Sequence, residues 1–221
     1  MQFSYLMLIV VTMAIGAGAS WWVNHQLKKF QHVPSTTRLT GYQMATGMLE
    51  YYGVKGVRVL PGAQGEDFFN PVDMTIKLGP ESFNGSSITA MATACHEVGH
   101  ACQHAQGYQP MKVRSALVPV ANFTQNTWIF ILLIGIFLNL AGFVYLAIAF
   151  YAVAVLFQIV TLPVEFDASK RALVYMQTVG LPGGEVAGSK SVLTACALTY
   201  VAAALVSVLQ LLYLLSANRD E

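Results

Sequence analysis

Long apolar segments alternate with polar segments along the chain. Residues 3–23, residues 115–164 and residues 191–216 contain no Asp, Glu, Lys or Arg. A helix needs about 20 apolar residues to cross the roughly 30 Å hydrocarbon core of a bilayer, so the middle segment is long enough for two crossings. The sequence NLAG at residues 139–142 is typical of a turn between them. Because only helices satisfy their own backbone groups in lipid at such lengths, the pattern predicts four transmembrane helices.

The longest polar segment has the apolar spacing of two further helices. The first extends from Thr40, as its N-cap, through Tyr52, and Gly53 ends it. The second is longer, begins at Ser86 or Ser87, and contains three of the five histidines of the chain. Between them, apolar and polar residues alternate in two short segments, which predicts strands at residues 56–62 and 74–79.

These elements predict a mainly α polytopic membrane protein with a small α+β zincin-like domain that contains a short β-hairpin. The residues NPVD, at positions 70–73, predict its turn. The expected organisation is transmembrane helices at residues 3–23, 118–138, 143–163 and 191–216, a zincin-like segment at residues 24–114, and a second polar segment at residues 164–190.

Composition and charge agree with a membrane protein. Apolar residues are 55% of the chain and charged residues only 10%, against about 25% in soluble domains. The net charge of +1 gives no reason to expect a nucleic-acid partner. Eleven of the twelve Lys and Arg residues lie in residues 24–114 and 170–190. Since basic loops stay in the cytoplasm, we expect a multi-pass plasma-membrane protein with both polar segments cytoplasmic and both termini outside.

The motif HEVGH predicts hydrolytic metal chemistry. His96 and His100 are four residues apart, so on a helix both imidazoles project from one face and can bind one Zn²⁺ ion. Glu97 is the expected general base, because a carboxylate next to the first ligand can take a proton from a zinc-activated water. Two histidines at this spacing also occur on ordinary helix surfaces, so a third ligand is needed.

Glu165 is the strongest candidate for the third ligand, because it follows the third apolar segment directly, where that helix should meet the motif. Pro163 helps to mark the end of that helix. Asp167 is the alternative in the same segment. His104 is about 12 Å from His96 along a straight helix, so we expect it to be a supporting or surface residue. Cys95 and Cys102 are expected to pack in the interior rather than bind metal.

Three stretches make the chain resemble the YugP-type family of membrane neutral zinc metallopeptidases. They are ACHEVGHACQHAQGYQPMKVRSALVPVANF, VLFQIVTLPVEFDASKRAL and LTACALTYVAAAL, and the resemblance extends over nearly the whole chain, including NPVDMTIKL. It implies peptide-bond hydrolysis in or at the membrane, with His96 and His100 as zinc ligands and Glu97 as the base.

The segment EFDAS is also similar to the third-ligand motif of the HtpX and CAAX-prenyl-protease group of gluzincins, and it places Glu165 at the ligand position. That group usually has Asp where this chain has Ser169, so Asp167 could replace the missing supporting residue.

The expected function is therefore a zinc metalloendopeptidase that acts on peptides or membrane proteins at the cytoplasmic face. The alternatives are a non-catalytic membrane zinc-binding protein, which would not need Glu97, and a metal transporter, which would need the same residues inside the bilayer. Candidates for stabilising the oxyanion are Tyr108, Arg171 and Tyr200.

Two further expectations concern packing and substrate. Gly99 lies in the middle of a helix, where glycine costs about 1 kcal/mol relative to alanine, so we expect the helix of Glu165 to approach closely there. The strand at residues 74–79 is either an edge strand that pairs with an extended substrate or part of a hairpin that only packs on the histidine helix.

Overall fold

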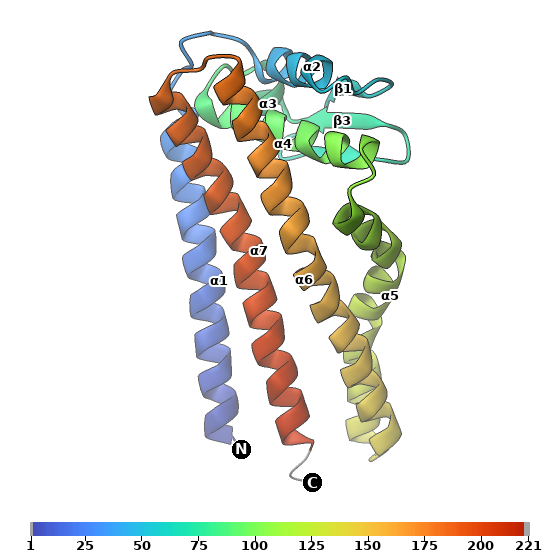
Figure 1. Ribbon diagram of the computed structural model, residues 1–221. Helices are drawn as coiled ribbons and strands as arrows, with labels where there is room; N and C mark the ends of the chain where they lie inside the picture. Colours follow the sequence, from blue (N-terminus) through green and yellow to red (C-terminus); the bar gives the residue numbers. More distant parts are fainter. Residues whose placement is uncertain (1, 219–221) are drawn as a thin grey trace. The chain divides into compact units, whose positions relative to one another are not determined.

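The structure is a computed structural model that describes residues 2–218, with side chains from residue 5 onward. It is mainly helical and contains one small sheet (Figure 1). In chain order, its elements are α1 (Gln2–Gln31), α2 (Gly41–Tyr51), β1 (Arg58–Pro61), β2 (Phe68–Asn70), β3 (Thr75–Leu78), α3 (Pro80–Asn84), α4 (Ile88–Ala105), α5 (Gln109–Phe137), α6 (Ala141–Thr178) and α7 (Gly183–Ala217).

Four helices are long and apolar enough to cross a membrane: α1, α5, α6 and α7. The apolar segments of the sequence predict these four helices, and their presence, length and apolar composition are confirmed. Large apolar side chains along them are exposed, for example Leu6 at 60% and Phe137 at 83%, as expected for surfaces that face lipid. The predicted turn between α5 and α6 is also present, and Asn139 adopts a left-handed backbone there, with φ 54°.

The chain forms two compact units. One comprises Met1–Ser20, Lys112–Leu162 and Thr199–Glu221. Its described residues are almost all helical, and aromatic rings pack between the helices. The ring centroids of Trp128 and Tyr151 are 4.6 Å apart. The hydroxyl of Tyr151 also donates a hydrogen bond to Gln210 Oε1 at 3.1 Å, so polar as well as apolar contacts join α6 to α7 in this unit.

The other unit comprises Trp21–Met111 and Pro163–Leu198, and it contains the sheet. The strand order is β1-β3-β2, with β1 parallel and β2 antiparallel to β3. Both predicted strands are present, as β1 and β3, but they do not form a hairpin with each other. The hairpin consists of β2 and β3, joined through the predicted turn, and the pattern missed β2 because this strand has only three residues.

The position of β3 overturns one expectation. Its sequence, TIKL, is the central strand of the sheet, with β1 on one side and β2 on the other. Of the two alternatives for this segment, the edge strand is therefore wrong, and the edges of the sheet are β1 and β2.

Local sequence signals position the helices of this unit as expected. Thr40 caps α2 by accepting a hydrogen bond from the backbone of Gln43, whose side chain accepts one from the backbone of Thr40 in return. Gly53 follows α2 with φ 65°, which favours glycine. Ser87 caps α4 by accepting a hydrogen bond from the backbone N–H of Ala90 at 3.2 Å. The predicted start and end signals are thus confirmed.

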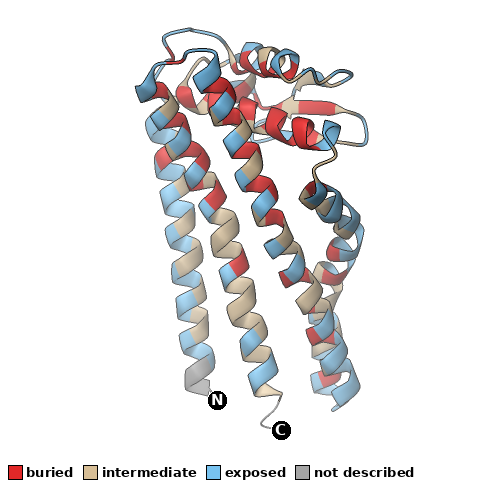
Figure 2. Cartoon of the chain, viewed as in Figure 1, coloured by how far each residue is buried: buried red, intermediate tan, exposed pale blue. Residues whose placement is uncertain are grey.

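Helix α4 lies at the centre of this unit. Figure 2 shows buried residues along most of its length, on the sheet and on neighbouring parts of α2. Met44 and Met48 of α2, Ile76 of β3, and Met91 and Val98 of α4 belong to one apolar core and are almost fully buried. This packing holds α4 rigidly, which is the condition for a precise site on its surface.

Helix α6 continues through Pro163, contrary to the expectation that this proline marks the helix boundary. Pro163 has no N–H to donate, but the helix remains regular up to Thr178. Glu165 therefore lies within a long helix and not in a segment that follows it, so its position is fixed by helical geometry.

Candidate metal centre

Three side chains from α4 and α6 converge at one point. His96 Nε2 lies 3.2 Å from Glu165 Oε2, and His100 Nε2 lies 3.6 Å from the same oxygen. One nitrogen from each histidine and one carboxylate oxygen all lie within 4.8 Å of one another. Among the described residues, this is the group of His, Cys, Asp and Glu side chains that could hold a metal ion. The sequence predicted all three members.

The donor set and spacing suit zinc. Two ligands about 2.1 Å from a tetrahedral Zn²⁺ ion are about 3.4 Å apart, close to both histidine–carboxylate separations given above. Two imidazole nitrogens and one carboxylate are typical of zinc in hydrolytic enzymes, where a fourth position stays open. The side chain of Glu165 is only 2% exposed, and those of His96 and His100 are 14% and 9% exposed. A carboxylate buried to this degree requires a cationic partner.

Gly99 allows the two helices to come this close. A Cβ at this position would lie 2.6 Å from the carbonyl oxygen of Ala168 and 2.9 Å from its Cα. Any side chain would therefore collide with the backbone of α6. The predicted close approach of the Glu165 helix to Gly99 is confirmed.

Gln103 orients His100, and sequence reasoning did not identify it. His100 Nδ1 donates to Gln103 Oε1 at 3.1 Å, because an amide oxygen can only accept. The amide nitrogen of Gln103 donates to the carbonyl oxygen of Val164 at 2.7 Å and to Asp167 Oδ2 at 2.9 Å. Gln103 is fully buried. The Nε2 atom of His100 is thereby directed towards Glu165, and such support of the other ring nitrogen is common for metal-binding histidines.

Ser169 supports His96 in the same way. Its hydroxyl oxygen lies 3.2 Å from His96 Nδ1, on the ring side opposite the candidate metal position. Asp167 instead accepts a hydrogen bond from Arg171 Nε at 2.6 Å and reaches His100 only through Gln103. The replacement of the usual Asp by Ser169 therefore leaves a polar group in contact with the histidine.

Glu97 lies on α4 between the two histidines and is 8% exposed. Its Oε2 accepts a hydrogen bond from the backbone N–H of Phe69, on β2, at 2.9 Å. Burial raises the pKa of Glu97, and the neighbouring histidines only partly offset this effect. For His100, burial lowers the pKa, but the hydrogen bond to Glu165 and the nearby carboxylates raise it more, so the net direction is upward.

The other candidates lie outside this group. The ring of His104 is 5.8 Å from that of Phe69, and His104 does not belong to the candidate metal group. Cys95 and Cys102 are free, buried thiols of the apolar core. The expected packing of Cys95 and Cys102 in the interior is confirmed, and the expected role of His104 as a supporting or surface residue stays a prediction.

Two of the candidates for oxyanion stabilisation, Tyr108 and Arg171, lie near each other. Arg171 is bound to Asp167 and Gln106, and its guanidinium group lies 5.8 Å from the ring of Tyr108. Tyr200 belongs to the other compact unit. The described contacts thus give Arg171 a supporting role beside Asp167.

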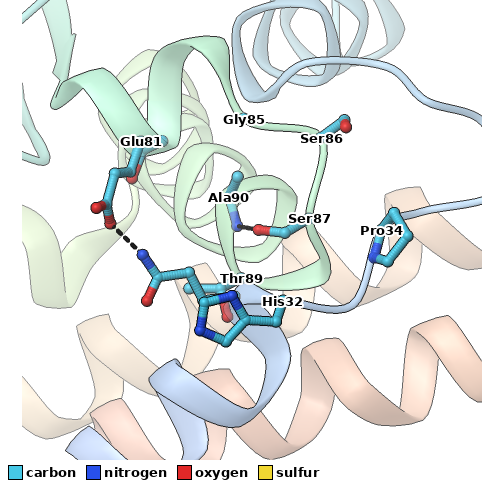
Figure 3. A pocket seen from close by; sticks show the side chains of 10 residues that line it. His32, Pro34, Glu81, Gly85, Ser86, Ser87, Thr89 and Ala90 are labelled. Atoms are coloured by element: carbon cyan, nitrogen blue, oxygen red, sulfur yellow. Dashed lines mark hydrogen bonds between the residues drawn. The ribbon is translucent and has the colours of Figure 1, made fainter.

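A separate pocket of about 470 Å³ lies between the end of α1 and the start of α4 (Figure 3). None of the three candidate ligands lines it. The amide of Gln31 donates to Glu81 at 2.5 Å, and the hydroxyl of Ser87 is used as the cap of α4. Gln31 and Glu81 thus bind each other, and Ser87 contributes to the local structure of α4.

Comparison with known proteins agrees with the geometry. A family model described as "Putative neutral zinc metallopeptidase" matches residues 5–219. The protein named "Putative membrane protease YugP" of Bacillus subtilis (strain 168) is 36% identical over 213 residues, which cover 93% of this chain and 94% of that protein. No solved structure matches. The resemblance indicated by the sequence motifs is confirmed.

Proposed function

The chain belongs to the family described as "Putative neutral zinc metallopeptidase", and from this premise we propose that it is a membrane endopeptidase whose zinc ligands are His96, His100 and Glu165. The observation that supports this assignment is the convergence of three ligand atoms within 4.8 Å of one another, from two helices that Gly99 allows to touch. Gln103 and Ser169 orient the two histidines from outside this group.

Glu97 is the proposed general base and acid. When bound, zinc supplies a Lewis acid that polarises the scissile carbonyl and lowers the pKa of a water molecule to about 7. Glu97 takes a proton from the attacking water and passes it to the leaving amine. Burial raises the pKa of Glu97, which improves it as a base and as a subsequent acid near neutral pH. The N–H of Phe69 orients the carboxylate for this transfer.

The substrate backbone is proposed to pair with β2. This strand is an edge of the sheet, and the N–H of Phe69 points to Glu97 instead of to β3. An extended peptide that adds to this edge would bring its own backbone next to Glu97. This proposal replaces the expectation that a substrate pairs with β3, because β1 and β2 already pair with both sides of that strand.

The proposed site faces the cytoplasm. Its support is the distribution of basic residues, since residues 24–114 and 170–190 contain eleven of the twelve Lys and Arg residues. Fusions of a cytoplasm-dependent reporter at the C-terminus and within residues 62–66 would test this: we expect activity only from the internal fusion. Activity from the C-terminal fusion would reverse the orientation.

The decisive experiment replaces Glu97 by Gln in the full chain, purified in detergent with zinc. We expect unchanged zinc content and a fall in peptide hydrolysis of about 10²–10⁴-fold, the usual contribution of a general base. Glu50→Gln is the matched control, because Glu50 is an exposed carboxylate outside the candidate site. Full turnover in Glu97→Gln would contradict the proposal, and a wild-type protein that binds zinc without hydrolysing peptides would favour the non-catalytic alternative.

A further inference from the structure

A groove of about 320 Å³ extends between α6 and α7, within the unit that contains the candidate metal centre. Its wall from α6 consists of Phe166, Ser169, Lys170, Leu173, Val174 and Gln177, and its wall from α7 of Lys190, Leu193, Thr194 and Ala197. The groove is separate from the metal centre. Ser169 is common to both, since its hydroxyl also contacts His96.

Two lysines give this groove its charge. Lys170 and Lys190 face it from opposite walls, and both are exposed. Among the described residues, neither lysine has a carboxylate partner within salt-bridge distance; the carboxylates nearest in sequence, Asp167 and Glu185, are bound to Arg171 and to the segment around Ser35. The groove therefore has two positive charges that the chain itself does not neutralise.

Apolar residues line the groove on both sides of the lysines: Leu173 and Val174 follow Lys170 on α6, and three others lie on the opposite side. Phe166 precedes Lys170 on α6, and Leu193 and Ala197 follow Lys190 on α7. On both helices, this is the side from which the long apolar segments extend in sequence. Phe166 is 48% exposed, like other large apolar side chains of the four long apolar helices. From the lysines towards Phe166, Leu193 and Ala197, the order from charged to apolar matches the order of a phospholipid from headgroup to acyl chain.

We propose that this groove binds an anionic phospholipid, with its phosphate between Lys170 and Lys190 and an acyl chain against Phe166, Leu193 and Ala197. Basic pockets between membrane helices on the cytoplasmic side bind such headgroups. The charges select the anionic headgroup, and the apolar contacts distinguish a lipid from free phosphate. This binding site goes beyond the proposed peptidase function, and it places a lipid on the far side of Ser169 from His96.

The test compares lipid retention by the full chain. Wild-type protein is placed in nanodiscs of equal parts phosphatidylglycerol and phosphatidylcholine, extracted into mild detergent, and examined by native mass spectrometry. We expect one retained phosphatidylglycerol per chain and little phosphatidylcholine. The double variant Lys170→Gln/Lys190→Gln should bind phosphatidylglycerol roughly 30-fold more weakly, about fivefold for each lysine.

Two further variants separate specific binding from general attraction to an anionic surface. Lys28→Gln/Lys29→Gln removes the same charge from the last turn of α1 and should leave retention unchanged. Thr194→Trp fills the groove from an exposed position with both lysines intact, and retention should be lost. Zinc content serves as the check that each variant is folded.

Three outcomes would overturn the proposal. Equal loss of phosphatidylglycerol in the two double variants would show only surface attraction. Complete displacement of the lipid by millimolar inorganic phosphate would identify a phosphate site instead. Equal retention of phosphatidylcholine by the wild type would remove the role of the lysines.

Discussion

Gly99 of α4 lies directly against the backbone of Ala168 of α6, where an added Cβ would be 2.6 Å from the carbonyl oxygen. Gly99 stands between His96 and His100 in sequence, and Ala168 stands between Glu165 and Ser169. The two helices are therefore in close backbone contact where the candidate ligands meet. This relationship sets the distances between the histidines and the carboxylate.

Replacing Gly99 should damage both stability and the metal site. In Gly99→Ala, the new methyl group collides with backbone and not with a flexible side chain, so α6 must shift, at a cost of about 1–3 kcal/mol. We expect a lower thermal unfolding midpoint and weaker zinc binding, measured by competition with a chelator. Gly184→Ala is the control, because nothing lies within 4 Å of a Cβ at this helical position. A Gly99→Ala protein with wild-type zinc affinity would show that the close contact does not define the site.

The ligand assignment predicts a graded loss of zinc. His96→Ala and Glu165→Gln each remove one donor, and Glu165→Gln keeps the size of the buried side chain, so its loss of affinity cannot be attributed to a cavity. We expect zinc per protein, measured by elemental analysis after dialysis, to fall well below one in both variants. His104→Ala should retain full occupancy, because His104 lies outside the candidate group. Full zinc in Glu165→Gln would refute its assignment as the third ligand.

Gln103 should tune zinc affinity without binding zinc. Gln103→Leu removes the partner of His100 Nδ1, and loss of such a supporting contact typically weakens metal binding 10–100-fold. Gln103→Glu keeps an oxygen for His100 but loses the donors to Val164 and Asp167, so it should bind zinc more tightly than Gln103→Leu if the histidine contact matters most.

The control for Gln103 is Gln64→Ala, an exposed glutamine in the segment between β1 and β2, outside the contacts of Gln103. Thermal unfolding of the metal-free proteins separates a purely structural effect from positioning. Equal zinc affinities for Gln103→Leu and Gln103→Glu, with equally reduced stability, would assign Gln103 a structural role only.

What the sequence could predict follows from how local each signal is. His96, Glu97 and His100 belong to one helical turn, so their spacing alone predicted that they share a face. Glu165 could be inferred because it follows a long apolar segment, with further support from its motif. Gln103, by contrast, acts through partners more than 60 positions away on α6, Val164 and Asp167, and no local pattern indicates such contacts.

The errors in the sheet and in α6 have a similar physical origin. β2 has three residues, which are too few to show an alternating pattern. Because the pattern missed this strand, it did not indicate that β3 lies between β1 and β2. At Pro163, only one backbone donor is lost, and the chain packed around α6 outweighs that local penalty. The first error thus comes from the short length of a strand, and the second from packing that a local signal does not contain.

Buried thiols provide a last test of the ligand set. Cys95 and Cys102 flank the motif but are 0% exposed, and burial raises the pKa of Cys102 to about 11. At pH 8, both thiols should therefore remain protonated and inaccessible, so iodoacetamide should leave them unmodified in the native protein, with zinc content unchanged. After denaturation both should react, as peptide mapping by mass spectrometry would show. Native alkylation of either cysteine accompanied by loss of zinc would mean that a thiolate belongs to the metal centre, and the set of two histidines and one glutamate would have to be revised.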